Sequence, residues 1–206
     1  AEDGIRDHCV TGVQTCALPI FDRLRAQFET NVFGLVRLCQ LVLPGMRAQK
    51  WGKIVNIGSM GGTLTFPGGG AYHASKYALE AISDAMRFEV RNFGVDVVLV
   101  QPGLIKSGFA EAVVAKMDEV EGPYASFNAA VSRATVEAYE RGPLARLGGV
   151  PEDVAAVVQR AIEARKPRAR YTVTASATFL MTQRWLLPDS AWDQVLAASF
   201  PAPGAA

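Results

Sequence analysis

The sequence is poor in cysteine, in histidine and in net charge. Its 206 residues include 3 Cys and 2 His, and 21 Lys and Arg against 20 Asp and Glu leave a formal charge of +1. Three cysteines indicate neither a disulfide framework nor the ligand spacing of a metal site. Balanced charge gives no support to nucleic-acid binding or to attraction to an anionic membrane. We therefore expect no metal, no nucleic-acid partner and a reducing, cytoplasmic location.

The sequence also lacks a long apolar run. The uncharged stretch 54–75 is interrupted by six glycines and Pro67, so it is not a membrane-spanning helix. Apolar residues nevertheless make up 50% of the chain, which is enough for a large core. The length predicts one domain or at most two.

The first twenty residues lack the periodicity of the rest. Residues 1–20 show neither strand alternation nor a helical stripe, and they do not have the layout of a signal peptide. The segment resembles a translated sequencing adapter, with one arm at 10–20, the other at 1–7, and His8 and Cys9 in the place of a short index. We expect residues 1–20 to be non-native, and a natural divergent N-terminus is the alternative.

From Phe21 onward the pattern alternates between helices and short apolar strands. Gly94 is expected to end the second helix, Pro151 to open a later one and Pro188 to interrupt the last. Strand–helix–strand alternation with long crossovers predicts an α/β fold in which helices cover both faces of a parallel sheet. The helices are expected at 22–48, 71–93, 109–120, 126–141, 151–165 and 176–199. Buried strands are expected at 53–58 and 96–101, and a third strand at 171–174.

Residues with reactive side chains cluster at one predicted edge of the sheet. Tyr72 and Lys76 are four residues apart on one helix, so they share a face. Ser59 lies thirteen residues before Tyr72, where a buried strand ends, and Pro102-Gly103 follows the next strand. In open parallel sheets this edge is where ligands bind. Asn31 lies in Asn-Val-Phe-Gly on the preceding helix.

With these motifs in this order, residues 21–206 resemble the short-chain dehydrogenases/reductases (SDR), Rossmann-fold enzymes that depend on NAD or NADP. The matching motifs are Asn31-Val-Phe-Gly34, the strand ending in Gly58-Ser59, Tyr72-x-x-x-Lys76 and Pro102-Gly103-Leu-Ile-Lys-Ser107. The resemblance implies a single Rossmann-type, doubly wound domain whose first half is missing, with a substrate loop at about 104–147. Ser107 stands where the family usually has Thr.

The resemblance implies a role for each site residue. Tyr72 is expected to be the general acid/base, Lys76 the cation that lowers the pKa of its phenol from about 10, and Ser59 the donor to the substrate oxygen. Asn31 is expected to position a water that relays protons through Lys76. The cofactor is expected to contact Tyr72, Lys76, Pro102, Gly103, Ile105 and Ser107, and the substrate to contact Ser59, Gly61, Tyr124 and Phe127.

The family's cofactor-binding turn is not found. None of the 19 glycines forms Thr-Gly-x-x-x-Gly-x-Gly, the turn that cradles a pyrophosphate at a helix N-terminus. We expect about 90 upstream residues, three βα units, to be absent. The residue that selects between NAD and NADP is expected to be absent with them.

Two further questions stay open at this point. The tail after Pro151 resembles hydroxysteroid and retinol dehydrogenases, which predicts a hydrophobic secondary alcohol or ketone as substrate. The chain is expected to form a homo-oligomer through helices 22–48 and 71–93. The alternatives to an enzyme are an inactive truncated fragment and a dimerisation module without dinucleotide binding. His73 could act as a base but is expected to be structural. Phe66, Phe109, Met117, Tyr124 and Phe127 could line an apolar pocket or pack in the core.

Overall fold

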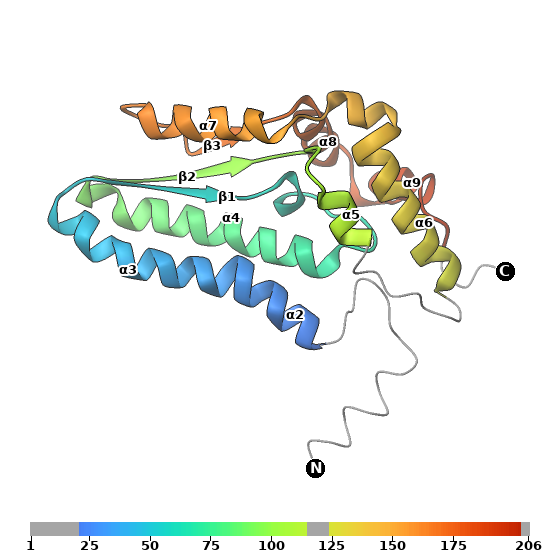
Figure 1. Cartoon of the computed structure of the whole chain (residues 1–206), viewed down its shortest axis with the longest axis horizontal. Helices are drawn as coiled ribbons and strands as arrows, with labels where there is room; N and C mark the ends of the chain where they lie inside the picture. The colour runs from blue at the N-terminus through green and yellow to red at the C-terminus, as the bar shows by residue number, and fades with distance from the viewer. Residues whose placement is uncertain (1–20, 115–123, 203–206) are drawn as a thin grey trace, which may run out of the picture.

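The fold is a three-layer α/β arrangement around a parallel sheet (Figure 1). The structure is a computed structural model, and it describes residues 21–114 and 124–202. The strands are β1 (Gly52–Ile57), β2 (Val95–Gln101) and β3 (Arg170–Thr172), in that order across the sheet, and both pairings are parallel. The predicted α/β class, the parallel sheet and the three strands are confirmed.

Helices cover both faces of this sheet. α3 (Gly34–Ala48) and α4 (Gly70–Val90) lie on one face, and α7 (Pro151–Glu163) lies on the other (Figure 1). The remaining helices are α2 (Phe21–Phe28), α5 (Phe109–Val114), α6 (Ala125–Val136), α8 (Ala175–Leu186) and α9 (Asp189–Ala197). The last two are separated at Leu187–Pro188, as predicted.

The alternation of side chains along β1 explains the layers. Ile54 and Asn56 are buried on the α4 side, where Ile54 joins Met86 in a core and Asn56 donates a 2.9 Å hydrogen bond to Ser83. Lys53 is on the opposite side and reaches α7. β2, paired on both sides, is buried along nearly its whole length. The expectation of a buried strand at 53–58 holds in part: alternate residues of β1 are buried, but the strand has one described neighbour and Ile57 is 43% exposed.

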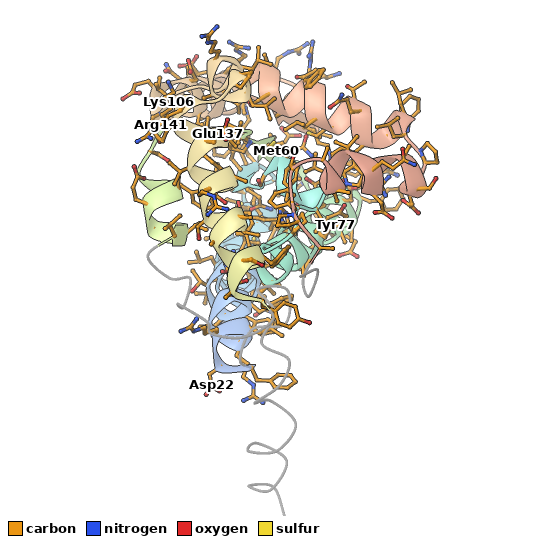
Figure 2. The ribbon with its side chains drawn as sticks, turned by 90° about the vertical axis from the view of Figure 1, so that its right-hand side faces the viewer. Asp22, Met60, Tyr77, Lys106, Glu137 and Arg141 are labelled. Carbon is orange, nitrogen blue, oxygen red and sulfur yellow. The ribbon has the colours of Figure 1, made fainter. Side chains whose placement is uncertain are left out.

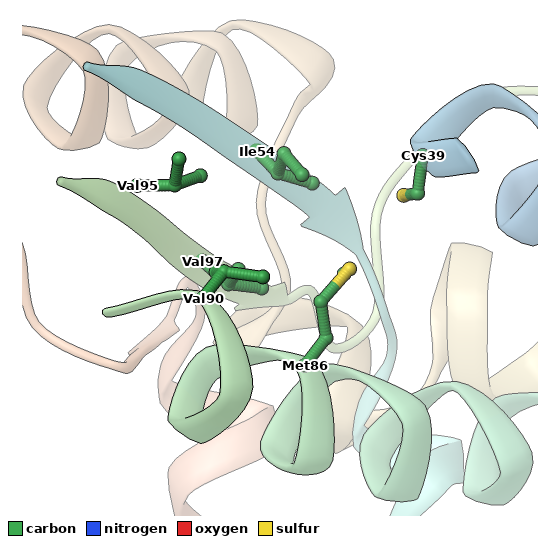
Figure 3. Packing of buried hydrophobic residues seen from close by; sticks show 6 residues of the cluster. All are labelled: Cys39, Ile54, Met86, Val90, Val95 and Val97. Carbon is green, nitrogen blue, oxygen red and sulfur yellow. The ribbon is translucent and has the colours of Figure 1, made fainter. Parts of the chain in front are cut away.

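Two apolar cores support the sheet. The first lies between α3, α4 and the sheet, and its cysteine is a small buried residue, as predicted (Figure 3). The second lies under the loop after β1 and against α8 and α9. The first contains Cys39, Ile54, Met86, Val90, Val95 and Val97, and the second Met60, Leu64, Leu104, Ala177, Leu180 and Trp192. Figure 2 looks onto the end of the molecule where α5, α6 and α9 lie, with Met60 near its centre.

The predicted helix boundaries hold with two differences. The helix expected at 22–48 is divided by a π-helical turn at Glu29–Phe33, and the one expected at 126–141 ends in a second π-helical turn at Glu137–Arg141. Gly94 ends the helical segment that begins with α4, as expected. Its φ of +75° is in the left-handed region that favours glycine, and a Cβ at this position would collide with the Lys50 carbonyl. The expected helix at 109–120 is observed as α5, and residues 115–120 lie outside the described part.

Candidate functional site

The predicted site lies where β1 and β2 end on the same edge of the sheet. Backbone hydrogen bonds continue past the strands, from Gly58 N–H to the Val100 carbonyl at 2.8 Å and from Met60 N–H to the Pro102 carbonyl at 2.9 Å. A cavity of about 730 Å³ opens at this edge. Seven of the predicted site residues line it, namely Ser59, Tyr72, Lys76, Pro102, Gly103, Ile105 and Ser107.

Ser59 caps the short 3-10 helix Met60–Gly62 that follows β1. Its Oγ accepts a 3.0 Å hydrogen bond from Gly61 N–H, and the side chain is buried. Ser59 and Tyr72 line the same cavity, and hydrogen bonding by the Ser59 side chain acts to lower the pKa of the Tyr72 phenol. Because the Gly61 N–H can only donate, Ser59 accepts there and keeps its own proton for a second partner.

Tyr72 and Lys76 come from the first two turns of α4. Burial raises the pKa of Tyr72 above its usual value of 10.0, and the hydrogen bond from Ser59 acts in the lowering direction. The Lys76 ammonium donates to the Ile57 carbonyl at 3.0 Å and lies 5.8 Å from the centroid of the Tyr72 ring. Burial lowers the pKa of Lys76.

The expected lowering of the Tyr72 pKa is therefore wrong for the unliganded chain. Removing a phenol from water disfavours its charged form, and here burial outweighs the other influences on Tyr72. Tyr72 is consequently a neutral phenol over the physiological range, and a neutral phenol is a proton donor.

Asn31 approaches α4 from the π-helical turn Glu29–Phe33. Its Nδ2 donates a 3.0 Å hydrogen bond to Ser75 Oγ, and that hydroxyl donates a 2.7 Å bond to the Tyr72 carbonyl. Asn31 is not among the residues that line the cavity. The observed role of its side chain is to tie this turn to the first turn of α4, and the expected water relay through Lys76 stays a prediction.

Three other predicted site residues lie away from the cavity lining. Gly61 is buried against the His73 ring, Phe127 is buried on α6, and Tyr124 is partly buried at the start of that helix. Their expected contacts with substrate stay predictions. Phe66 packs against Trp192 with ring centroids 6.1 Å apart, and Met117 lies outside the described residues.

Gly103 has a packing reason besides the expected one. A Cβ at this position would collide with the hydroxyls of Thr174 and Ser176, where α8 begins. Ser176 Oγ also accepts a 3.2 Å hydrogen bond from Leu104 N–H. The absence of a side chain at 103 thus lets the strand end approach α8.

Aromatic and aliphatic side chains complete the cavity wall. The Phe109 ring lies 5.7 Å from Tyr72 and 5.5 Å from Tyr139, so three aromatic rings form a row. Val154, Val158 and Ile162 of α7 also line the cavity. Sequence reasoning missed Tyr139 and these α7 residues. The spacing of four along α7 was a usable signal, whereas nothing in the sequence distinguishes Tyr139 from a core tyrosine.

The electrostatics of Tyr139 follow from this setting. Burial and the nearby Tyr72 phenol raise the pKa of Tyr139 far above its ordinary range. Within the ranges 21–114 and 124–202, no cluster of three or more potential metal ligands exists. No helix in those ranges is both long and apolar enough to cross a membrane.

Comparisons with known proteins agree with the motif pattern. A family model described as short chain dehydrogenase matches residues 11–118. The uncharacterized oxidoreductase YbbO of Escherichia coli K12 is 37% identical over 176 residues, covering 84% of this chain and 59% of the relative. The NADPH-dependent 3-dehydrocapnine reductase of Ornithobacterium rhinotracheale is 35% identical over 179 residues, covering 84% of this chain and 61% of the relative.

Solved structures give the same picture. A short-chain dehydrogenase from Streptomyces avermitilis superposes with a TM-score of 0.65 at 30% identity, covering 85% of this chain and 60% of that chain. An SDR from Burkholderia phymatum in complex with NAD superposes with a TM-score of 0.60 at 26% identity, covering 81% and 58%. The chain thus spans about three fifths of the length of these proteins. The family match begins inside segment 1–20, whose expected non-native origin stays a prediction.

Proposed function

Since the chain belongs to the short-chain dehydrogenase/reductase family, we propose that it is the catalytic part of an NAD(P)-dependent oxidoreductase that interconverts a hydrophobic secondary alcohol and a ketone. The observation that supports this best is the shared cavity of Ser59, Tyr72 and Lys76, with the Lys76 ammonium 5.8 Å from the centroid of the Tyr72 ring. The chain covers 59% of YbbO, so the activity of the whole protein is part of the proposal.

The residues at the cavity fit the nicotinamide half of a dinucleotide. The ammonium of Lys76 donates one hydrogen bond to the Ile57 carbonyl, and its two other N–H groups remain for ribose hydroxyls. Pro102, Gly103, Ile105 and Ser107 bring a stretch of backbone and one hydroxyl to the same cavity. When bound, the dinucleotide would supply or accept a hydride. A family relative uses NADPH and a structural neighbour holds NAD, and we propose no choice between them.

In the direction of reduction, the chain's own residues handle the proton. The neutral Tyr72 phenol gives its proton to the carbonyl oxygen as the carbonyl carbon takes up a hydride, which yields the alcohol and a phenolate. Ser59 donates a hydrogen bond to the same oxygen while negative charge develops on it. The Lys76 ammonium stabilises the phenolate until it regains a proton, for which Asn31 is proposed to hold a relaying water.

The cavity wall supports an apolar substrate. Phe109, Val154, Val158 and Ile162 present ring and aliphatic surface beside the proposed reacting atoms, and burying such surface is the main source of affinity for apolar ligands. The curated relative that acts on 3-dehydrocapnine is a reductase by name. We also propose a reducing compartment, the cytoplasm, because Cys39 is a free, buried thiol.

Substitution of Tyr72 tests the proposal. The test uses the 206-residue chain and a chimera in which the N-terminal part of YbbO precedes residue 21, with turnover of an apolar ketone followed by the absorbance of the reduced cofactor. We expect Tyr72→Phe to lower kcat by about 100-fold or more, because the acid/base group is lost while the ring remains. Tyr77→Phe, which alters an exposed phenol on the same helix, should leave kcat unchanged.

Two outcomes would contradict the proposal. One is wild-type turnover that survives Tyr72→Phe, and the other is no turnover in either protein with any apolar ketone tried. Titration of NADH and NADPH into the 206-residue chain separates the alternatives for this chain alone. Tight binding excludes an inactive fragment without a dinucleotide site.

A further inference from the structure

His73 lies between the catalytic helix and the loop that follows β1. It neighbours Tyr72 on α4, and its side chain is 8% exposed. Both ring nitrogens have backbone partners in that loop. Nδ1 lies 3.0 Å from the Gly61 carbonyl oxygen, and Nε2 lies 3.3 Å from Phe66 N.

These two partners define the tautomer of the imidazole. The Phe66 N–H can only donate, so Nε2 must accept and carries no proton. Nδ1 then carries the proton and donates it to the Gly61 carbonyl. Burial acts in the same direction, because it lowers the pKa of His73 below its usual 6.5 and keeps the ring neutral.

The loop is shaped around this ring. A Cβ at Gly61 would lie 2.6 Å from Nδ1, and a Cβ at Gly69 would lie 2.7 Å from Nε2, so neither position has room for a side chain. The centroid of the Phe66 ring lies 6.2 Å from that of the imidazole, and the centroid of the Tyr72 ring lies 5.6 Å from it in a T-shaped arrangement. His73 therefore bridges two points of one loop that are five residues apart.

The bridge continues to the reacting groups through a single residue. His73 holds the carbonyl of Gly61, and the N–H of Gly61 donates to Ser59 Oγ at 3.0 Å. With one side of Oγ engaged by this N–H, the hydroxyl proton of Ser59 is left for a partner in the cavity that Ser59 shares with Tyr72. The orientation of Gly61 thus decides where Ser59 donates.

We propose that His73 is a positioning residue, which acts through Gly61 to aim the Ser59 hydroxyl at the oxygen that Tyr72 protonates. The inference rests on the proposed function for the identity of that oxygen. The bridge itself rests only on the two hydrogen bonds and the two glycine contacts.

Protonation of His73 in acid should break the hydrogen bond between Phe66 N–H and Nε2. A protonated imidazole has no acceptor for the Phe66 N–H, so two donors would face each other. The phenol of Tyr72, which touches the ring, stays neutral in acid, because its pKa is raised. The charged groups farther along α4 are engaged elsewhere, Lys76 with Ile57 and Glu80 with Gln101 and Arg170. The positioned state is therefore complete above pH 6.5 and is lost as the pH falls below it.

Titration of the Tyr72 phenol in the 206-residue chain tests the bridge without turnover. Because the Ser59 hydrogen bond lowers the pKa of Tyr72, we expect both Ser59→Ala and His73→Phe to move its titration midpoint upward, and Tyr77→Phe to leave it unchanged. His73→Asn retains a donor toward Gly61 and should stay near the wild-type midpoint. Imidazole 15N shifts should show Nε2 unprotonated at neutral pH. A protonated Nε2, or a His73→Phe midpoint equal to the wild type, would overturn the bridge.

Kinetics of the active form tests the consequence. We expect His73→Phe to lower kcat by about 10- to 100-fold, with the KM for cofactor unchanged, because one oriented donor to the developing charge is lost. His73→Phe combined with Ser59→Ala should be no slower than Ser59→Ala alone, whereas a general loss of packing would add to it. In His73→Asn the fall of kcat below pH 6.5 should disappear. Additive losses in the double variant would refute the positioning role of His73. Absence of turnover by the wild type would reject the proposed function, and the titration of Tyr72 would then still test the two hydrogen bonds of His73.

Discussion

Two phenols share the cavity, and they differ in their partners. Ser59 acts to lower the pKa of Tyr72, whereas the nearby Tyr72 phenol acts to raise that of Tyr139, whose hydroxyl makes no hydrogen bond within the described residues. Burial raises the pKa of both, so each is a neutral donor at physiological pH. Tyr139 is therefore available to a second polar group on a substrate whose reacting oxygen meets Tyr72.

Replacement of Tyr139 by Phe should separate two kinds of substrate. For a ketone with a second hydroxyl or carbonyl group, we expect kcat/KM to fall about tenfold, which corresponds to one hydrogen bond of about 1.4 kcal/mol. For a purely apolar ketone of similar size, kcat/KM should stay within about twofold, because the ring is retained. Steady-state kinetics with matched substrate pairs measures this.

Tyr77→Phe is the matched control, because Tyr77 is an exposed phenol that does not line the cavity. An equal effect of Tyr139→Phe on both substrates would show that the hydroxyl acts through packing rather than through recognition.

Residue types and spacing predicted which groups meet, but not their ionisation. The four-residue spacing of Tyr72 and Lys76 placed both on one face of α4, and both line the cavity. The direction of the Tyr72 pKa was predicted wrongly. Desolvation depends on every atom packed around the phenol, and part of that packing comes from Phe109, which lies far along the chain.

Among the helices, the π-helical turn at Glu29–Phe33 has the clearest consequence for the site. The extra residue in such a turn shifts the helix face, and these turns are frequent at functional positions. Here Asn31 reaches Ser75 of α4 from this turn. The apolar pattern of 22–48 predicted one continuous helix, because a single inserted residue hardly changes the period of a stripe that is already wide.

α7, which forms one wall of the cavity, is fastened to the sheet by Lys53. The Lys53 ammonium donates to the carbonyls of Ile162 and Ala164, at 2.5 Å each, where the helix ends. A cation at this position satisfies carbonyls that have no helical partner and complements the negative end of the helix dipole.

Lys53→Met should loosen this wall. The variant keeps the apolar stem and removes the ammonium, so we expect the free energy of unfolding to fall by about 1–2 kcal/mol. Denaturant unfolding measures the loss, and amide exchange should increase in the last turn of α7. Lys106→Met, at an exposed position that lies outside α7, should change neither quantity. Equal losses in the two variants would contradict a specific role for Lys53.

In the whole molecule, one face of the α3–α4 layer remains apolar and exposed. Leu38 and Leu41 of α3 are 65% and 60% exposed, and Phe88 of α4 is 64% exposed. Exposed apolar surface of this kind marks interaction sites. It supports the proposal that the chain forms a homo-oligomer through the helices expected at 22–48 and 71–93.

Leu41→Glu should dissociate that oligomer. A charge in an apolar interface is desolvated without a partner, so we expect sedimentation velocity at micromolar concentration to show a dimer for the wild type and a monomer for the variant. Leu186→Glu, at a comparably exposed position on α8, should leave the dimer intact. A monomeric wild-type chain would prove the prediction wrong.

A partly buried polar network joins β3 to α4. Arg170 of β3 bonds Glu80 at 3.0 Å and Asp84 at 2.6 Å, and Glu80 accepts a 2.7 Å bond from Gln101. The Arg170 guanidinium holds the pKa of Asp84 below its usual value. This network connects residues up to 90 positions apart, so no local sequence pattern predicted it.

The order of elements and the meeting of Ser59, Tyr72 and Lys76 could be derived from residue types alone, because side-chain periodicity and the parallel sheet together put strand ends and the first turns of α4 at one edge. Only the tertiary structure decided that His73 accepts from Phe66 N–H and donates to the Gly61 carbonyl. It also decided that the Tyr72 phenol is removed from water, which raises its pKa. Those properties depend on distances and burial among residues from separate segments, and such quantities exist only once the chain has folded.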